Sequence, residues 1–198
     1  MDILHECALS FEKLLNIQYH FVLGRKGNLK EFYLSFDKSD FHHLAGLHKL
    51  KDINALQIGK RSDVFDAILS NKITTQDIQK SEFYKQMYFR LEPLSNIEVL
   101  LDDNQLIFRY NEKIRQYSVI KADYLLENQY LNQSVYLFLG ARTTENDQMC
   151  RTLFPKDIID YAQGQPQYTL LKKEKLNIET GEIEQQYNRM SDDINKKE

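Results

Sequence analysis

Histidines are the residues of this chain with the clearest catalytic potential. Three of the five, His42, His43 and His48, fall within residues 41–50. If this segment is one helix, a rotation of about 100° per residue places His48 on the apolar face and the other two on different sides. The spacing lacks the i, i+4 pair of metal-binding helices, so zinc is not favoured. His48 is then either a core histidine with satisfied ring nitrogens or an imidazole facing a cleft between helix and sheet.

Basic and hydroxyl side chains recur along the second half of the chain. They are Lys121, Arg151, Thr152, Lys172 and Lys173. Cleavage of RNA without a metal or other cofactor needs a base near the 2′-hydroxyl, an acid near the leaving 5′-oxygen and a fixed cation on the phosphate. Histidine, lysine, arginine and threonine fit these roles. Because such residues come from separate strands and meet only in space, they form no compact motif.

Several other chemistries lack their signatures in this sequence. It contains no GxSxG, P-loop or GxGxxG motif, and its two cysteines, Cys7 and Cys150, form no CxxC pair. Acid pairs such as Asp102 and Asp103 fall in a predicted turn, where solvation explains them. Serine hydrolases, kinases and nucleotide-dependent dehydrogenases are therefore not favoured.

The elements that must position these residues follow from periodicity and turn signals. An amphipathic helix is expected at residues 2–16, a hairpin of strands at 18–23 and 29–36, and a short helix at 40–50. Residues 53–95 carry helical patterns, including a long helix that Thr74 or Thr75 caps and that reaches residue 91 before Pro93. Five strands are expected at 106–110, 117–126, 134–139, 149–154 and 168–176.

The predicted fold class is α+β. It has an N-terminal helix and hairpin, a helical layer, and then a curved, mostly antiparallel sheet with helices on one face. We expect a single domain at residues 1–176, followed by a polar, acidic hairpin and tail at 177–198 in which Gly181 turns the hairpin.

Composition limits the class and the partners of the protein. The 198 residues are 42% hydrophobic and carry a formal charge of -3. Eight basic residues stand against four acidic ones at 25–61, whereas six acids stand against three bases at 178–198. With two cysteines, no visible export signal and no apolar run long enough to span a bilayer, we expect a cytoplasmic protein that does not bind membranes.

Three segments together resemble a known family: residues 41–50 with the histidines, residues 120–126 with Lys121, and residues 161–175 with Gln165. In this order they resemble a phage-associated nuclease-like family of the barnase/EndoU/colicin/RelE superfamily. The resemblance implies a metal-independent endoribonuclease of toxin or phage-effector type. It suggests His43, His48, Lys121, Arg151 and Thr152 as catalytic residues, and Lys172, Lys173, Tyr161 and Gln165 as substrate-binding residues.

Two alternatives to an RNA-cleaving enzyme remain open. One is a catalytically silent relative that binds or inhibits a host protein, which the slightly acidic charge favours, because free ribonucleases are usually basic. The other is the antitoxin-free half of a toxin pair, in which the acidic tail masks the basic stretch at residues 25–61 of the same chain. The partner is accordingly RNA in the first interpretation and a host or cognate protein in the others.

Overall fold

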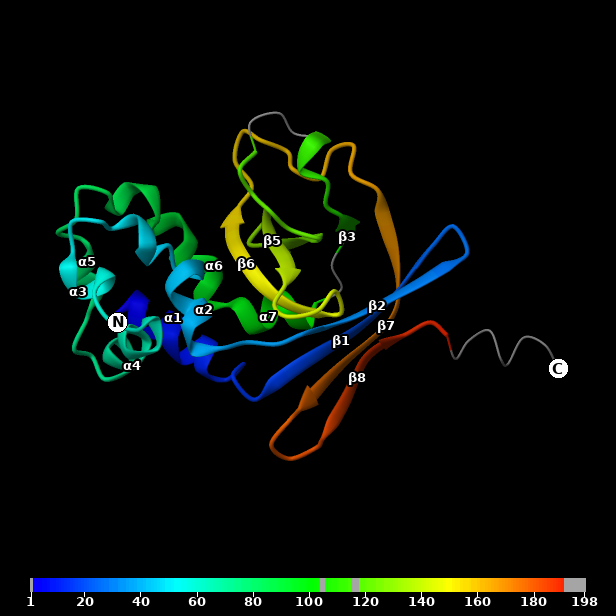
Figure 1. The fold of residues 1–198 in the computed structure, drawn as a ribbon, viewed down its shortest axis with the longest axis horizontal. Helices are drawn as coiled ribbons and strands as arrows, with labels where there is room; N and C mark the ends of the chain where they lie inside the picture. The colour runs from blue at the N-terminus through cyan, green and yellow to red at the C-terminus, as the bar shows by residue number, and fades with distance from the viewer. Residues whose placement is uncertain (1, 104–105, 115–117, 191–198) are drawn as a thin grey trace.

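The strands form a closed barrel in the computed structural model, which describes residues 2–103, 106–114 and 118–190 (Figure 1). The strands are β1 (Ile17–Arg25), β2 (Asn28–Leu34), β3 (Leu106–Arg109), β4 (Tyr124–Tyr130), β5 (Gln133–Ala141), β6 (Asp147–Pro155), β7 (Gln167–Asn177) and β8 (Ile183–Asn188). Among the described residues, seven strands close in the order β1-β2-β6-β5-β4-β3-β7, and β7 pairs back to β1. Only β2 and β6 run parallel in this ring. β8 lies outside it, paired to β7.

The expected open, curved sheet is therefore wrong, although the mixture of helices and antiparallel strands is confirmed. The reason lies in β7, whose first two residues pair with β3 while Thr169 and the residues after it pair with β1. One long strand thus joins the two ends of the sheet, and closure removes the edges that an open sheet would expose. The expected hairpin at β1 and β2 is present and forms part of the barrel wall.

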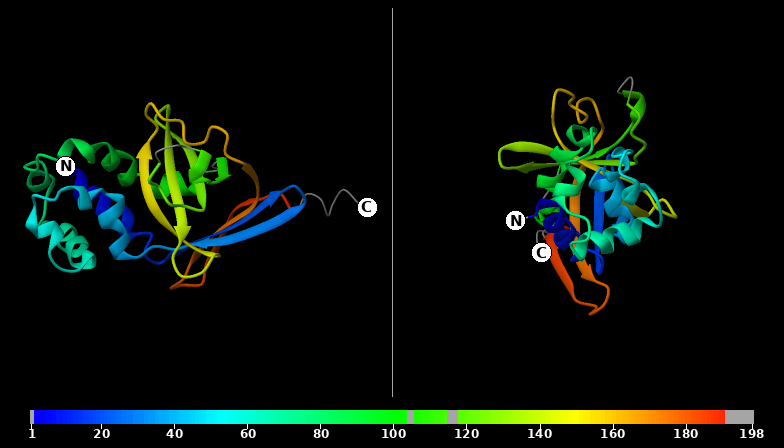
Figure 2. Two further views of the ribbon diagram at one scale, coloured as in Figure 1. Left: turned by 45° about the horizontal axis from the view of Figure 1, so that its top comes forward. Right: turned by 90° about the vertical axis from the view of Figure 1, so that its left-hand side faces the viewer.

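Helices α1 to α6 gather at one side of the barrel, whereas α7 lies against the strands, where Asn128 of β4 donates to the Leu100 carbonyl (Figures 1 and 2). They are α1 (Ile3–Glu12), α2 (Lys38–Leu44), α3 (Asn54–Gln57), α4 (Arg61–Leu69), α5 (Thr75–Ile78), α6 (Leu91–Ser95) and α7 (Ile97–Asp102). Short 3-10 turns are η1 (Leu47–Lys49), η2 (Tyr84–Gln86), η3 (Tyr88–Arg90) and η4 (Glu112–Ile114). A large buried cluster that includes Phe11, Phe41, Phe21 and Leu137 joins this layer to the barrel. The helices and the barrel therefore share one core.

The single helix expected at residues 40–50 is two elements. α2 ends at Leu44, and η1 begins at Leu47 after Gly46, which has a φ of +78°. A Cβ atom at Gly46 would lie 2.8 Å from the Cβ of Met87, so both the left-handed backbone and the close packing require glycine. The break changes the direction in which His48 projects.

The long helix expected from Thr74 to residue 91 is also wrong. Thr74 does cap a helix, but α5 ends at Ile78. Asp52 accepts hydrogen bonds from the Ser81 hydroxyl at 2.5 Å and from the Glu82 amide at 3.0 Å, which turns the chain away. Pro93 falls in the first turn of α6, where a missing amide proton costs nothing, rather than ending a helix.

Later segments follow the sequence expectations more closely. Four of the five expected strands match β3, β5, β6 and β7 within a few residues. The strand expected at 117–126 begins only at Tyr124, and Tyr117 lies outside the described residues. The turn at Gly181 joins β7 to β8. The end of the tail, residues 191–198, lies outside the described residues.

Both faces of β4 and β5 are buried. Leu126 and Leu137 belong to the large core, whereas Leu125, Tyr136 and Phe138 belong to a second, smaller cluster. Ile120, Ala122, Tyr161 and Ala162 cover that second cluster. The segments before β4 and after β6 are thereby held against the barrel wall, where they border the cleft described below.

Candidate active site

A cleft of about 1290 Å³ opens between the helical layer and β6. Its lining comes from the α2 and η1 segments, the η3 to α6 turn, β6, and the segments at residues 119–121 and 155–161. It brings together side chains that are more than 100 residues apart in sequence, as His43 and Arg151 illustrate.

His43 and His48 stack on each other in this cleft. Their ring centroids are 4.1 Å apart and their planes differ by 12°. Among the described residues, no protein group hydrogen-bonds to a ring nitrogen of either, and the Nδ1 atom of His48 is buried without a partner. By contrast, the Nε2 atom of His42 lies 2.8 Å from the Leu56 carbonyl oxygen. His42 is thus a core histidine tied to the backbone, whereas the ring nitrogens of the stacked pair have no hydrogen-bond partner among the described protein groups.

Both stacked imidazoles are neutral near pH 7. Burial, followed by the charge of Arg90, lowers the pKa of His43 to about 4. Burial, followed by the neighbouring His43, lowers the pKa of His48 to about 3. A neutral imidazole can accept a proton, so the pair is in the protonation state that a general base needs, and the lowered pKa values make each ring a weaker base than a free imidazole.

Arg90 is a buried cation that the sequence reasoning missed. It is 7% exposed, and its Nη1 atom donates to the Thr152 hydroxyl at 2.6 Å and to the Leu153 carbonyl at 3.2 Å. Its Nε atom is buried without a partner, and within the described part of the chain it forms no ion pair with a carboxylate. Burial lowers its pKa to about 10, which still leaves it charged at neutral pH. An anion in the cleft would supply the missing counter-charge.

A β-bulge in β6 sets the direction of the Arg151 side chain. Along β5, Phe138 pairs with Thr152 and Leu139 pairs with Cys150, so Arg151 is the extra residue of a β-bulge. Its side chain lies across Gly140, where a Cβ atom would approach the Arg151 Nε to 2.8 Å. The Nη2 atom donates to the Ala141 carbonyl at 2.5 Å. Glycine at position 140 thus lets the guanidinium lie flat on β5.

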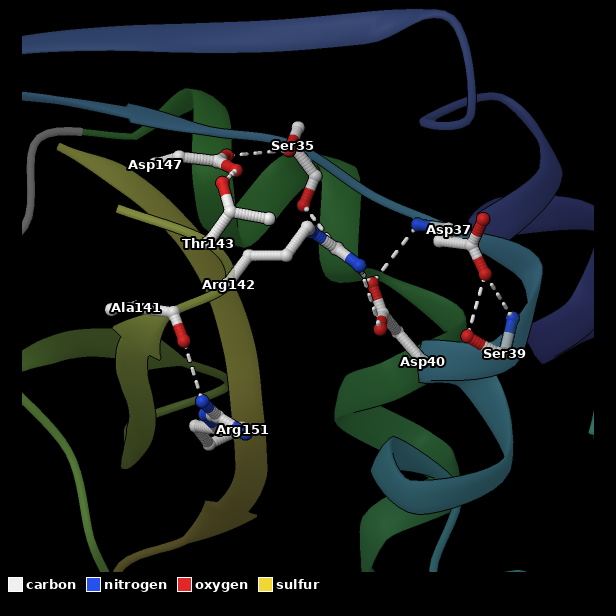
Figure 3. A network of polar contacts seen from close by, with 9 residues as sticks. All are labelled: Ser35, Asp37, Ser39, Asp40, Ala141, Arg142, Thr143, Asp147 and Arg151. Carbon is white, nitrogen blue, oxygen red and sulfur yellow. Dashed lines mark hydrogen bonds and ion pairs between the residues drawn. The ribbon is translucent and has the colours of Figure 1, made fainter. Parts of the chain in front are cut away.

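A buried ion pair fixes the histidine-bearing helix to the strand pair that carries Arg151 (Figure 3). Arg142, just after β5, donates to the carboxylate of Asp40 in α2 and to the Ser35 carbonyl at 3.2 Å. The Asp40 side chain is 3% exposed and also accepts from the Asp37 amide at 2.9 Å. This network sets the position of α2 relative to β5 and β6.

The cleft is electropositive although the whole chain carries a charge of -3. Among its described lining residues, five are basic and two acidic: Lys49, Arg90, Lys121, Arg151 and Lys156 against Glu92 and Asp157. Lys156 is paired with Asp160 at 2.7 Å and with Glu127 at 3.8 Å, which leaves four cations against the two acids. Most of the basic stretch at residues 25–61 lies elsewhere, and Lys49 is its one lysine or arginine among these lining residues. The local charge suits an anionic ligand.

Six of the nine sequence-predicted site residues line the cleft. They are His43, His48, Lys121, Arg151, Thr152 and Tyr161. His48 lines the cleft, but the helix-face argument for its direction is wrong, because His48 lies in η1 rather than in α2.

The other three predicted residues have structural contacts instead. Lys173 is fully buried and its ammonium donates to the Leu101 and Asp103 carbonyls, so it cannot reach a substrate. Lys172 pairs with Glu174 at 2.7 Å. Gln165 is buried, and its side chain hydrogen-bonds the backbone of Asn111. None of the three is among the described residues that line the cleft.

Two further observations bear on the class of the protein. Among the described residues, no group of three or more histidine, cysteine or acidic side chains is arranged to hold a metal ion. None of the described helices is long and apolar enough to cross a membrane.

A family model described as phage-Barnase-EndoU-ColicinE5/D-RelE like nuclease4 matches residues 3–190. No curated protein and no solved structure matches. The matched range covers the helical layer, the barrel and every residue that lines the cleft.

Proposed function

Since the chain belongs to the phage-Barnase-EndoU-ColicinE5/D-RelE like nuclease4 family, we propose that its cleft is the active site of a metal-independent endoribonuclease. The observation that carries this proposal is the convergence of a neutral, stacked histidine pair with two arginines from different elements. They supply the base and the phosphate-binding cations that attack of a ribose 2′-hydroxyl on the adjacent 3′-phosphate requires.

The proposed reaction assigns one role to each group. A neutral imidazole of the His43 and His48 pair takes the proton of the 2′-hydroxyl. The 2′-oxygen then bonds to phosphorus as the bond from phosphorus to the 5′-oxygen breaks, which leaves a 2′,3′-cyclic phosphate and a 5′-hydroxyl. Because the two imidazoles lie against each other, the proton for the 5′-oxygen has to come from another element, and Lys121 is the candidate.

The cations act on the phosphate itself. Arg90 and Arg151 face charge that builds on the non-bridging oxygens, and a buried guanidinium without a carboxylate partner stabilises such charge strongly. Thr152 accepts from Arg90, so its own hydroxyl proton remains available for donation to the phosphate. Tyr161 stays a candidate substrate contact, because it lines the same cleft.

The test is incubation of the purified protein with total RNA in EDTA. We expect fragments with 2′,3′-cyclic phosphate ends, and we expect His48→Ala to abolish them while the circular dichroism spectrum is unchanged. His20→Ala is the matched control, because His20 lies on β1, is flanked by Glu31 and Glu174, and is not among the cleft-lining residues. Cleavage that survives His48→Ala, or that EDTA abolishes, contradicts the proposal.

A binding or inhibitory module acting on a host protein is the second candidate. Apolar side chains are exposed at the rim of the cleft: Val119 is 91% exposed and Ile158 is 93% exposed. Such a rim suits a protein surface better than an RNA backbone. Intact RNA, together with a stoichiometric host protein retained by the wild type but not by a Val119→Ser, Ile158→Ser variant, would support this candidate.

A further inference from the structure

An aromatic wall forms part of the cleft beside the arginine and histidine groups. It consists of Tyr84, Tyr88 and Phe89. Tyr84 and Tyr88 are offset-stacked with centroids 5.8 Å apart, and Phe89 meets Tyr88 edge to face at 6.1 Å. Tyr88 is 52% exposed and Phe89 is 36% exposed. The chain thus places large rings at the cleft surface instead of in its core.

Cations lie directly beside these rings. The Lys49 ammonium is 5.8 Å from the Phe89 centroid, and the Arg90 guanidinium carbon is 5.7 Å from it. The Lys49 side chain is held there, since it donates to the Gln86 carbonyl at 2.9 Å. A nucleotide joins a flat base to an anionic phosphate, so an exposed ring next to a fixed cation matches both of its parts.

We propose that Tyr88, supported by Tyr84 and Phe89, stacks an unpaired base and restricts the site to single-stranded RNA. This inference rests on the proposed function. Bases in an A-form duplex are paired and stacked on one another inside the helix, whereas an unstacked base in a loop or single strand is free to lie on an exposed ring. The rings stack any base, so the wall selects strandedness rather than sequence.

The test measures binding apart from cleavage. A fluorescein-labelled single strand with 2′-O-methyl riboses has no free 2′-hydroxyl and cannot be cleaved by the proposed reaction, and its affinity is compared with that of a duplex of the same sequence by anisotropy. We expect the single strand to bind at least 10-fold more tightly. Tyr88→Ala should weaken single-strand binding about 5-fold to 100-fold, as expected for the loss of one base-stacking contact. Tyr88→Phe, which keeps the ring, should bind like the wild type.

Tyr33→Ala is the matched control. Tyr33 is 37% exposed on β2, stacks on His20 at 4.5 Å and is not among the residues that line the cleft. Its loss should leave both affinities unchanged. A melting temperature for each variant shows that the fold is retained.

Each outcome separates this inference from the proposed function. Equal affinity for duplex and single strand, or unchanged binding by Tyr88→Ala, overturns the stacking role even if RNA is cleaved. Selective single-strand binding that Tyr88→Ala removes supports it even if unmodified RNA stays intact, and in that case the cleavage proposal alone fails. If the wild-type protein binds neither the single strand nor the duplex, the inference is overturned, and a protein partner becomes the candidate ligand of the aromatic wall.

Discussion

Arg90 donates a hydrogen bond to the Thr152 hydroxyl at 2.6 Å, from a turn of the helical layer to a strand of the barrel. The two residues are 62 positions apart and both are buried. This bond joins the two halves of the fold at the floor of the cleft, where Arg90 also lowers the pKa of His43. Position and charge in the site therefore depend on this buried guanidinium, whereas the low pKa of His43 follows from burial first and from Arg90 second.

Replacement of Arg90 by lysine should impair cleavage more than folding. Lysine keeps the charge but loses the planar fork that reaches Thr152 and Leu153 together. We expect kcat/KM on a single-stranded oligonucleotide to fall about 100-fold, the usual cost of losing one positioned hydrogen-bond donor that faces charge in the transition state. Arg25→Lys, on β1 and not among the lining residues, is the control. Equal activities of the two variants would exclude a direct role for Arg90.

Gly140→Ala should displace Arg151 without removing its charge. The added methyl group would meet the Arg151 Nε at 2.8 Å, and this flexible side chain can move away at little cost to the fold. We expect a roughly 10-fold loss of kcat/KM with a change in unfolding free energy below about 1 kcal/mol.

A double-mutant cycle checks that the loss acts through Arg151. The pair Gly140→Ala, Arg151→Ala should be no less active than Arg151→Ala alone, because the guanidinium that the methyl group would move is already absent. Additive losses would mean that Gly140 acts in another way.

Asp40→Asn should destabilise the protein by about 3–5 kcal/mol, because it leaves the partly buried Arg142 without its counter-charge. Arg142→Met should destabilise the protein by a similar amount, because it leaves the buried Asp40 carboxylate without its counter-charge. The double variant should recover part of the loss, since neither charge is then stranded. Urea unfolding measures all three. Singles that change the unfolding free energy by less than 1 kcal/mol would show that the network in Figure 3 does not hold α2 in place.

Stability should fall as the pH drops below about 6.5, the pKa of a histidine in the unfolded chain. The folded pKa values of His43 and His48 are about 4 and about 3, so between these limits the unfolded chain binds protons that the native protein does not. The unfolding free energy therefore decreases with acidification through this window and is fully retained above it. The partial exposure of both rings reduces the effect to roughly 1 kcal/mol between pH 7 and pH 5.

The double variant His43→Gln, His48→Gln isolates this contribution. It keeps His42, whose pKa burial also lowers, and the carboxylates that titrate at lower pH. Urea unfolding at pH 7, 6 and 5 should show a shallower loss for the variant than for the wild type. Parallel profiles would mean that the stacked rings are protonated in the native state.

Local sequence signals predicted much of the fold. Aromatic and β-branched segments on either side of the loop at residues 24–28 predicted the hairpin of β1 and β2, and the helical spacing of apolar residues predicted α1, which Asp2 caps. The predictions failed where distant packing decides. Met87 lies against Gly46 and demands a break in the histidine segment, which no helical pattern within residues 40–50 could reveal.

The candidate site was predictable only in part. Residue type was enough to select the histidines, Lys121, Arg151 and Thr152. Arg90 carries no local signal, because its burial and its bond to Thr152 arise from tertiary contacts. The bulge at Arg151 depends on how β5 and β6 pair, which the sequence of β6 alone does not reveal. Residue type also selected Lys173 as a substrate-binding residue, but this side chain is fully buried.

The seam between β1 and β7 has a consequence for synthesis on the ribosome. Ile17 pairs with Asn177, so β1 cannot pair with β7 until β7 has left the ribosome. The nascent chain carries unpaired strand edges for most of its translation, and contacts this far apart in sequence form slowly. The barrel wall bearing Arg151 is therefore sealed only after residue 177 has been made.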